Sequence, residues 1–558
     1  MRKKSDIRVV VGIDFGTTYS GFALASVANP DTIETNEAWP GIRGQLKTNT
    51  VLAYDEELNV VKWGNPALSE KPSKKRPSSS SDKKLQKPVE LFKLHFSNLD
   101  KNEKPPLLPG LDYQKAVADY LCEMGKLIKK TLETRWPGLD FYKHVRVVVT
   151  VPAEYNEYAK GTMRTCIYKA GLLDTLNSDK LEFTTEPEAA AIYCIRVLKE
   201  YSLKANDAFM IVDCGGGTTD LTTRKFTAAG RLEEMTENSG EYCGSTFVDR
   251  EFLKFLARKL GVGAIAKLRE HHYSQLQYLL QEFCLSVKLR FDGERETFQT
   301  HDLDLEDVCP TIKKYVVGEA LKTMEDAEWL IELDFDTVKE FFDKVLVRIL
   351  KLIKLQLMKT EYPCSAIFLV GGFAQSPYLL KRVREEFNSK VSYIAVPIEP
   401  IASIVRGAVY YGLDMDIVRT RVLKRTYGID ITRNWNEDDP INRRVSGSVI
   451  DVFQPLAIRG SKVEVNQKFT CILHPSFPEQ SIISFPIYTT DRDSAKYCDE
   501  DGMKMIGKLT AELPDMHLGK DRPIEFSLTF GKIEILATAR NLISGQVYET
   551  SFDLEYLD

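Results

Sequence analysis

The chain has 558 residues, of which 43% are hydrophobic and 28% are charged, and its formal net charge is −5. This length allows roughly two to four domains, and the small negative charge gives no general attraction to nucleic acid or to a membrane surface, so we expect neither as a partner. No apolar run reaches the roughly 18 residues of a transmembrane helix. The ten cysteines form no Cys-x-x-Cys pair, which favours reduced thiols and a cytoplasmic, or else nuclear, location.

The first feature along the chain is an apolar strand that ends in a small-residue turn. Residues 9–13 are followed by Asp14 and then by Phe15-Gly16-Thr17-Thr18-Tyr19. Glycine lets the backbone approach a ligand closely, and backbone N–H groups and threonine hydroxyls donate to phosphate oxygens. An aspartate at this point is a suitable acceptor for a hydrated Mg²⁺.

The middle of the first half alternates a polar insertion with regular elements. Residues 71–84 are rich in Lys, Pro and Ser, which predicts a solvated surface loop; a phosphorylated or nuclear-import segment is the alternative. Helical spacing of apolar residues predicts a helix over 111–134. The apolar run 145–151 predicts a buried strand that ends at Pro152, and a further helix is expected over about 155–169.

A second strand and turn of the same kind follows about 200 residues after the first. The strand ends at Asp213, and Gly215, Gly216, Gly217 and Thr218 precede Asp220. One such turn is weak support for a phosphate site. Two copies at opposite ends of one region predict a duplicated, two-lobed nucleotide clamp.

The last part of the chain changes character. Helices are expected over 247–260, 274–291 and 338–358, then a strand over 366–370 before Gly371 and Gly372, and a helix over 377–387. Beyond Leu413 short strands dominate, for example 469–473, 524–530 and 532–539, which predicts a separate all-β domain.

Taken in order, these motifs resemble the ATPase domain of the heat shock protein 70 (DnaK-like) family. Residues 13–20 resemble its first phosphate loop, 149–153 its connecting segment, 185–191 the stretch with its glutamate, 213–220 its second phosphate loop and 369–372 its adenosine loop. Residues 407–409 resemble the closing helix, so the likeness covers residues 7 to about 412.

The resemblance implies an α/β fold. It implies a two-lobed actin-like ATPase with duplicated ribonuclease-H-like lobes, followed by a C-terminal all-β sandwich-like domain without a helical lid. The implied domains are lobe I at 1–205 with an insertion at about 69–88, lobe II at 206–412, a linker at 413–424 and a substrate-binding-like domain at 425–558.

The resemblance also assigns roles, with ATP or ADP and Mg²⁺ as cofactors. Asp14 and Asp213 would hold the metal, and Lys93, Glu186 and Asp220 would be catalytic. A lone lysine between Phe92 and Leu94 is usually a surface residue of a half-buried strand, so this reading of Lys93 stays open beside the catalytic one, which we favour. The implied nucleotide-binding residues are Gly16, Thr17, Thr18, Tyr19, Gly215, Gly216, Gly217, Thr218, Gly244, Lys288, Gly371, Gly372 and Gln375.

The sequence departs from the family pattern at several of these places. Leu289 and Gln375 stand where arginines are expected to stack on adenine, so we expect adenine to be held loosely. Ile401 replaces an acidic residue, and the basic segment 417–425 replaces an apolar linker. These departures fit a divergent branch of the family, its type 12.

The function implied is a slow, Mg²⁺-dependent ATP hydrolase that acts as a chaperone-like protein. It would bind polypeptide clients or protein partners through the β domain, with co-chaperones or exchange factors as further partners. A nucleotide-binding scaffold with little hydrolysis is the alternative. A small-molecule kinase and a polymerising actin-like protein of the same fold are weaker ones.

Overall fold

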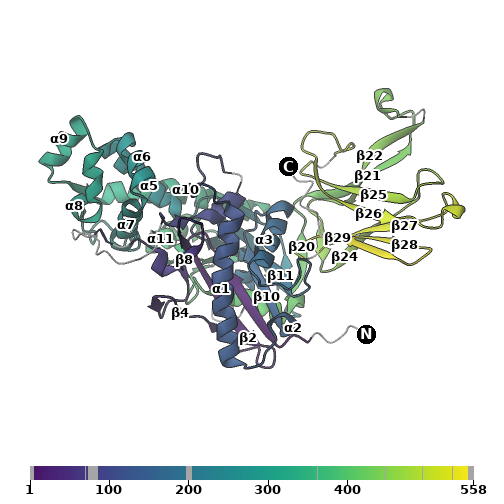
Figure 1. The fold of residues 1–558 in the computed structure, drawn as a ribbon, viewed down its shortest axis with the longest axis horizontal. Coiled ribbons are helices and arrows are strands. Elements are labelled where there is room, and N and C mark those ends of the chain that lie inside the picture. Colours follow the sequence, from purple (N-terminus) through teal and green to yellow (C-terminus); the bar gives the residue numbers. More distant parts are fainter. Residues whose placement is uncertain are drawn as a thin grey trace. The chain divides into compact units, whose positions relative to one another are not determined.

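The computed structural model describes residues 6–69, 71–72, 86–97, 99–195, 204–360, 362–445, 448–492, 494–530 and 532–550. Most of the expected insertion at 69–88, namely residue 70 and residues 73–85, lies outside the described residues. The chain divides into two compact units. The first comprises Met1–Glu154, Cys166–Thr222 and Ser239–Asp414, and the second Tyr155–Thr165, Thr223–Asn238 and Met415–Asp558. The elements make a mixed α/β protein (Figure 1).

The first unit begins with a six-stranded sheet in the order β11-β10-β1-β2-β3, with β6 also paired to β2. Its strands are β1 (Val9–Asp14), β2 (Tyr19–Ser26), β3 (Glu34–Thr35), β6 (Thr48–Asn49), β10 (Val145–Val151) and β11 (Leu181–Thr185). β1 and β10 run parallel, with Asp14 opposite Thr150. β1 is buried along its whole length, as expected for a sheet covered on both faces.

A second sheet repeats this arrangement. In the first unit its order is β19-β18-β12-β13, with β15 paired to β13. The strands are β12 (Ala208–Cys214), β13 (Thr219–Phe226), β15 (Ser239–Glu241), β18 (Cys364–Val370) and β19 (Tyr393–Ala395). β12 and β18 are parallel, and Asp213 lies opposite Val370. Asp14 and Asp213 therefore both lie at the carboxyl end of a buried strand, where the chain turns toward a glycine-rich loop.

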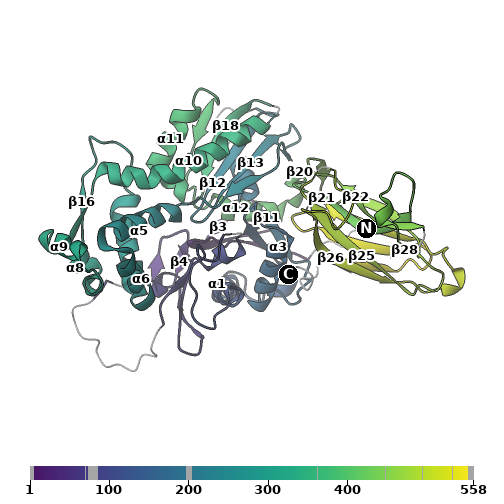
Figure 2. The same ribbon diagram turned by 90° about the horizontal axis from the view of Figure 1, so that it is seen from above.

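Helices cover these sheets and fill one large core. The core joins residues of β12 and β18 to residues of α5, α7, α10 and α11; in Figure 2, α10 and α11 lie beside β12 and β18. The helices of the first unit are α1 (Tyr113–Arg135), α2 (Phe141–His144), α4 (Glu186–Cys194), α5 (Thr246–Leu260), α6 (Val262–His271), α7 (Tyr273–Phe283), α8 (Leu305–Val308), α9 (Glu319–Asp326), α10 (Phe335–Lys359), α11 (Pro377–Phe387) and α12 (Ser403–Leu413). Among the described residues, every helix is too short or too polar to cross a lipid bilayer.

Helices α4 and α12 meet with their backbones in contact. A Cβ built on Gly407 of α12 would lie 1.7 Å from the carbonyl oxygen of Ala189 in α4. α12 also packs along β1 and β10. Only glycine permits so close an approach, so Gly407 fixes how α12 packs against α4.

Small sheets and short helices complete the first unit. The sheets are β4 (Ala38–Trp39) with β5 (Ile42–Arg43), β8 (Val60–Trp63) with β7 (Val51–Tyr54) and β9 (Val89–Glu90), and β16 (His301–Asp304) with β17 (Leu330–Leu333). The short helices are η1 (Asn65–Ala67), η2 (Phe92–Phe96), η4 (Cys284–Lys288), η5 (Pro310–Lys314) and η6 (Phe373–Gln375).

Two elements differ from the sequence prediction. The helix expected over 274–291 stops being α-helical at Phe283 and continues as the π-helical turn η4. The wider turn buries Val287 and Lys288 and leaves Leu285 and Leu289 exposed. The strand expected over 532–539 begins only at Leu536.

The second unit is built mainly of strands. After Met415 the described elements are η7 (Met415–Ile417), β20 (Val418–Val422), β21 (Thr426–Asn434), η8 (Ile441–Arg443), β22 (Val449–Ala457), β23 (Lys462–Glu464), β24 (Gln467–Leu473), β25 (Ile482–Thr490), β26 (Lys504–Glu512), η9 (Met516–Leu518), β27 (Ile524–Phe530), β28 (Leu536–Asn541) and β29 (Val547–Thr550). Two four-stranded sheets, β22-β21-β25-β26 and β24-β27-β28-β29, enclose one core.

Earlier segments of the chain belong to this unit as well. β14 (Leu232–Glu234) pairs in parallel with β20. The first turns of α3 (Glu157–Lys169) supply Arg164, whose guanidinium contacts Glu534 at 2.5 Å. Lys160 donates a hydrogen bond to the carbonyl oxygen of Ile533 at 2.7 Å. Ile533 belongs to the stretch 532–539, where a strand was expected, and its carbonyl oxygen is bonded to this side chain. The domain boundaries implied by the family resemblance stay a prediction.

Candidate functional site

The turn after β1 forms the first loop of the site, residues 16–19. The amide of Gly16 donates to Oγ of Ser20 at 3.1 Å, and the hydroxyl of Thr50 donates to the carbonyl oxygen of Gly16 at 2.9 Å. The amide of Thr50 donates to the carbonyl oxygen of Thr18 at 2.8 Å. These bonds hold the loop in one shape before any ligand binds, while Thr17 and Thr18 line a cavity.

The turn after β12 forms the second loop, residues 215–218. The amide of Gly215 donates to the carbonyl oxygen of Thr218 at 2.9 Å. The first residues of α5 hold the outer side, because the amide of Thr246 donates to the carbonyl oxygen of Gly216 at 2.9 Å. The loop is therefore as firmly held as the first.

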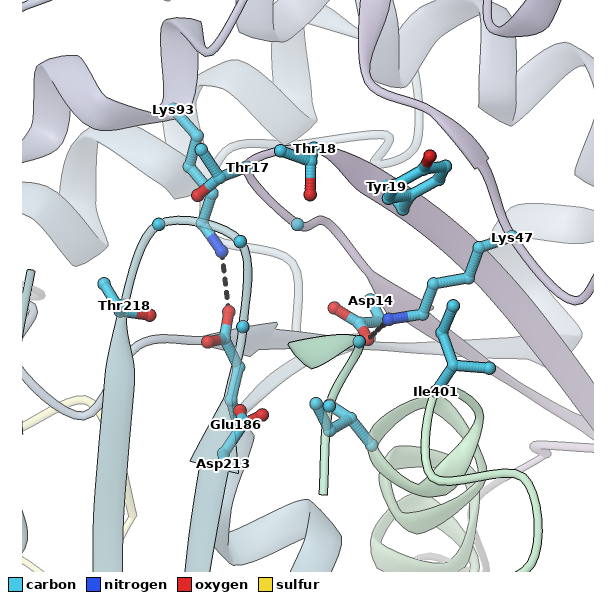
Figure 3. A pocket seen from close by; sticks show the side chains of 17 residues that line it. Asp14, Thr17, Thr18, Tyr19, Lys47, Lys93, Glu186, Asp213, Thr218 and Ile401 are labelled. Atoms are coloured by element: carbon cyan, nitrogen blue, oxygen red, sulfur yellow. Dashed lines mark hydrogen bonds and ion pairs between the residues drawn. The ribbon is translucent and has the colours of Figure 1, made fainter. Parts of the chain in front are cut away.

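The two loops face each other at very short range. A Cβ built on Gly216 would lie 2.3 Å from Oγ1 of Thr18, and one on Gly217 would lie 2.5 Å from Oγ1 of Thr17. Any side chain at these glycines would fill the space between the loops. Figure 3 shows Thr17 and Thr18 on one side of the cavity and the glycine loop ending at Thr218 on the other.

Lys93 and Glu186 form a buried ion pair inside this cavity. Lys93 Nζ lies 2.6 Å from Glu186 Oε1, and the two side chains are only 4% and 8% exposed. Leu91, in the left-handed region at φ 59°, turns the chain from β9 into η2 and so directs Lys93 inward. The alternative reading of Lys93 as a surface residue is therefore wrong. Burial raises the pKa of Glu186, and the neighbouring Lys93 opposes that rise.

Asp14 forms a second buried ion pair, which the sequence did not predict. Lys47 Nζ lies 2.6 Å from Asp14 Oδ2, and both side chains are almost fully buried. Thr150 Oγ1 lies 3.5 Å from the other oxygen of Asp14. In the sequence, Lys47 is a lone lysine shortly before the apolar run that includes β7. Lysines in such places are usually surface residues, so no sequence pattern pointed to this ion pair.

The two carboxylates that flank the second loop, Asp213 and Asp220, are both buried. Oδ1 of Asp213 is buried and has no hydrogen-bond partner among the described residues. Burial raises the pKa of Asp213 well above its usual value, and Glu186, Asp220 and Asp14 add to the rise. Oδ1 of Asp220 accepts the amide of Ala153 at 3.0 Å, so Asp220 ties the second loop to the segment after β10.

The donor set fits a polyphosphate with Mg²⁺, whereas the present volume does not. A buried carboxylate oxygen without a partner, as in Asp213, is what a hydrated cation would satisfy. Mg²⁺ is commonly bound by one or two carboxylates together with phosphates and water. No cluster of three or more His, Cys, Asp or Glu suited to a metal occurs in the described ranges. The cavity holds about 50 Å³, far less than the volume of a typical nucleotide pocket.

Curated relatives match this chain from end to end. Heat shock 70 kDa protein 12A of Mus musculus is 25% identical over an alignment that covers 98% of this chain and 91% of the relative. Heat shock 70 kDa protein 12B of Homo sapiens is 24% identical and covers 99% of this chain and 92% of the relative. The chaperone protein DnaK of Methanothermobacter thermautotrophicus is 24% identical over 77% of this chain and 64% of its own length.

Over almost its whole length the chain is similar to proteins of the heat shock 70 kDa type. Relatives that match over nearly the whole chain include the 12A and 12B proteins. A family model described as a domain of unknown function (DUF8340) matches residues 203–396, a range that contains the second loop.

Four residues expected at the site of this heat shock 70-like chain do not line the cavity: Asp220, Gly244, Lys288 and Gln375. Gly244 supports the second loop from behind, since its amide donates to the carbonyl oxygen of Gly217 at 3.2 Å. Gln375 is exposed in η6.

Lys288 instead lies 2.6 Å from Asp249. Burial alone would lower the pKa of Lys288, but Asp249 raises it overall. The remaining expected residues, Gly16–Tyr19 of the first loop, Gly215–Thr218 of the second, Gly371, Gly372, Asp14, Asp213, Lys93 and Glu186, all line the same cavity, together with Lys47, Ile401 and Ile404.

Proposed function

We propose that this protein binds ATP between two actin-like lobes and hydrolyses it slowly, as a chaperone-like member of the heat shock 70 family. The observation that carries the proposal is the meeting of two glycine–threonine loops around buried Asp14, Asp213 and the Lys93–Glu186 pair. Chemistry of this kind needs positioned cations and donors more than a covalent nucleophile.

The chain's own residues would divide the work as follows. Backbone amides of the two loops and the hydroxyls of Thr17, Thr18 and Thr218 would bind the phosphates. Lys93 would stabilise negative charge that develops on the terminal phosphate. Glu186, whose raised pKa keeps its proton affinity high, would orient the attacking water and exchange a proton with it.

Asp14 and Asp213 would hold Mg²⁺ through its water shell. When bound, the metal would supply positive charge that neutralises the phosphates. Asp220 would act on this shell indirectly, because one of its oxygens already accepts the amide of Ala153. Gly371 would leave room for the carboxylate of Asp213, because a Cβ at this position would lie 2.4 Å from Oδ1 of Asp213.

The test is a turnover assay on the full chain with Mg-ATP, paired with calorimetric measurement of ADP affinity. Asp14→Asn and Asp213→Asn should each lower turnover with Mg-ATP, whereas Asp179→Asn, an exposed aspartate of the same unit, should not. Lys93→Ala should lower turnover with little effect on ADP affinity. Unchanged turnover in both site variants would show that the site is misassigned.

We propose further that residues 425–558 bind polypeptide clients or protein partners, in the cytoplasm and with exchange factors as additional partners. Support comes from the likeness to relatives named as chaperones. Off-rates of a model peptide, measured with ATP and with ADP, test whether nucleotide controls this binding. Because the basic segment 417–425 does not match the family linker, we expect less than about a tenfold difference between the two nucleotides.

A scaffold that binds nucleotide but hydrolyses little is the second candidate. Both lysines of the cavity are paired with carboxylates, Lys93 with Glu186 and Lys47 with Asp14, so these four groups are satisfied without a substrate. ADP binding at micromolar concentration without measurable turnover would favour the scaffold over the ATPase.

A further inference from the structure

Lys47 places a fixed positive charge where the metal is expected. Its ammonium lies 2.6 Å from Asp14, and both side chains are buried. In Figure 3 the Lys47 side chain reaches Asp14 along the same side of the cavity as Ile401. Ile401 is apolar where the family has an acidic residue, so it offers Lys47 no competing partner.

The position of Lys47 is set by the sheet and not by a flexible loop. The next residues form β6, in which Thr48 and Asn49 pair with Ser20 and Tyr19 of β2. The carbonyl oxygen of Leu46 and the side-chain Cγ of Lys47 also crowd Gly21, because a Cβ there would lie 3.0 Å from each of them. The lysine is therefore held beside the first loop by the same strands that shape that loop.

The charges around the cavity show what Lys47 contributes. Its lining residues include two lysines, Lys47 and Lys93, and three carboxylates, Asp14, Glu186 and Asp213. Lys93 is engaged by Glu186. Without Lys47, a polyphosphate would enter a site with two uncompensated carboxylates and would depend on a metal to offset them. With Lys47, one of the two is already neutralised.

Lysine can also contact the ligand directly. An ammonium group has three N–H donors and no acceptor, and Lys47 uses one of them on Asp14. Two donors remain for phosphate oxygens, which lysine binds as a point charge. The aspartate thereby orients a cation toward the first loop, where Thr17 and Thr18 present their own donors.

We infer that Lys47 is a built-in counter-cation of the phosphate site, which makes nucleotide binding largely independent of a divalent metal. The inference rests on the proposed nucleotide site and refines it. Mg²⁺ keeps its place in hydrolysis, where charge develops beyond what one lysine offsets, but it is not required for the nucleotide to bind.

The experiment is calorimetric titration of the full chain with ADP, once in excess Mg²⁺ and once in excess EDTA. For the unmodified protein we expect the two dissociation constants to agree within fivefold. Lys47→Met should weaken ADP binding in EDTA by more than fivefold relative to Mg²⁺, because the metal then becomes necessary. Lys47→Arg keeps the charge and should behave as the unmodified protein does.

Matched controls separate the possible failures. Lys62→Met removes an exposed lysine close in sequence and should change neither constant. If Lys47→Met does not fold, as judged by circular dichroism, the inference is still tested by the ADP dissociation constants of the unmodified protein and of Lys47→Arg. For both proteins, the constants in Mg²⁺ and in EDTA should agree within fivefold.

Three results would overturn the inference. The first is a loss of more than fivefold in EDTA for the unmodified protein, and the second is a metal dependence of folded Lys47→Met no larger than that of the unmodified protein. Both leave the proposed nucleotide site standing. The third is the absence of ADP binding with or without Mg²⁺, which would overturn the proposed function itself.

Discussion

Replacing Lys93 by methionine tests the central ion pair of the site directly. The substitution keeps the length of the side chain but leaves Glu186, at 8% exposure, without its partner. Removing one member of a buried pair typically costs about 3–5 kcal/mol, because the other charge stays buried and uncompensated. Glu186 can escape by keeping a proton, since burial already raises its pKa. We therefore expect a loss of about 3 kcal/mol near neutral pH, in the lower part of that range.

The assay is urea unfolding followed by circular dichroism, with the free energy taken from the shift in midpoint. The double variant Lys93→Met/Glu186→Gln should recover most of the loss, since no buried charge is left unpaired. Lys254→Met is the matched control, because its ion pair with Glu251 is exposed on the lysine side and should cost less than about 1 kcal/mol. The reasoning is refuted if Lys93→Met costs no more than this control, or if the double variant loses the sum of both single losses.

Three further substitutions test other parts of the first unit. Burial raises the pKa of the Glu90 carboxyl group, so the folded protein binds the carboxyl proton more tightly than the unfolded chain does. The stability that this proton contributes is therefore lost as the pH rises above the ordinary glutamate pKa of about 4.3. Glu90→Gln should flatten the fall of Tm above that pH, and an unchanged slope would contradict this. Gly407→Ala should destabilise by at least about 2 kcal/mol, because its methyl group would collide with the carbonyl of Ala189; an unaltered Tm would rule out the close helix contact. Leu289→Arg should tighten ADP binding by roughly 1 kcal/mol, about fivefold, through stacking on adenine, with no gain if Leu289 lies away from the base.

Elements with strong local signals could be predicted from the sequence. The buried strand Val145–Val151 and the helix Pro377–Phe387 have the bounds that their patterns indicate. In the helix, Ser376 accepts the amide of Leu379 at 3.3 Å and proline follows it, so its start is encoded locally. The end of α7 is different. The π-turn at 284–288 accompanies the buried contact of Lys288 with Asp249, 39 residues earlier in the chain, and no periodicity of apolar residues reveals that.

In the candidate site, too, the parts with a local sequence pattern could be predicted and the parts that depend on distant contacts could not. Its two loops carry a glycine–threonine pattern that any reader of the sequence can find, and the structure brings them together. Lys47 carries no pattern, because its importance comes from Asp14, 33 residues away, and from a strand pairing that places it there. Single charged residues without a motif become visible only when the fold gives them a partner.

The second unit is drawn from three separate stretches of the chain, and this has a consequence for how the protein is made. Residues 155–165 and 223–238 leave the ribosome long before residues 415–558, on which β14 and the first turns of α3 depend for their partners. Domains usually fold in order during synthesis, but this unit cannot be completed until the strands after residue 415 have been made. A truncated chain beginning at residue 415 would lack β14 and leave β20 with an unpaired edge, so the unit cannot be exchanged between proteins as one contiguous segment.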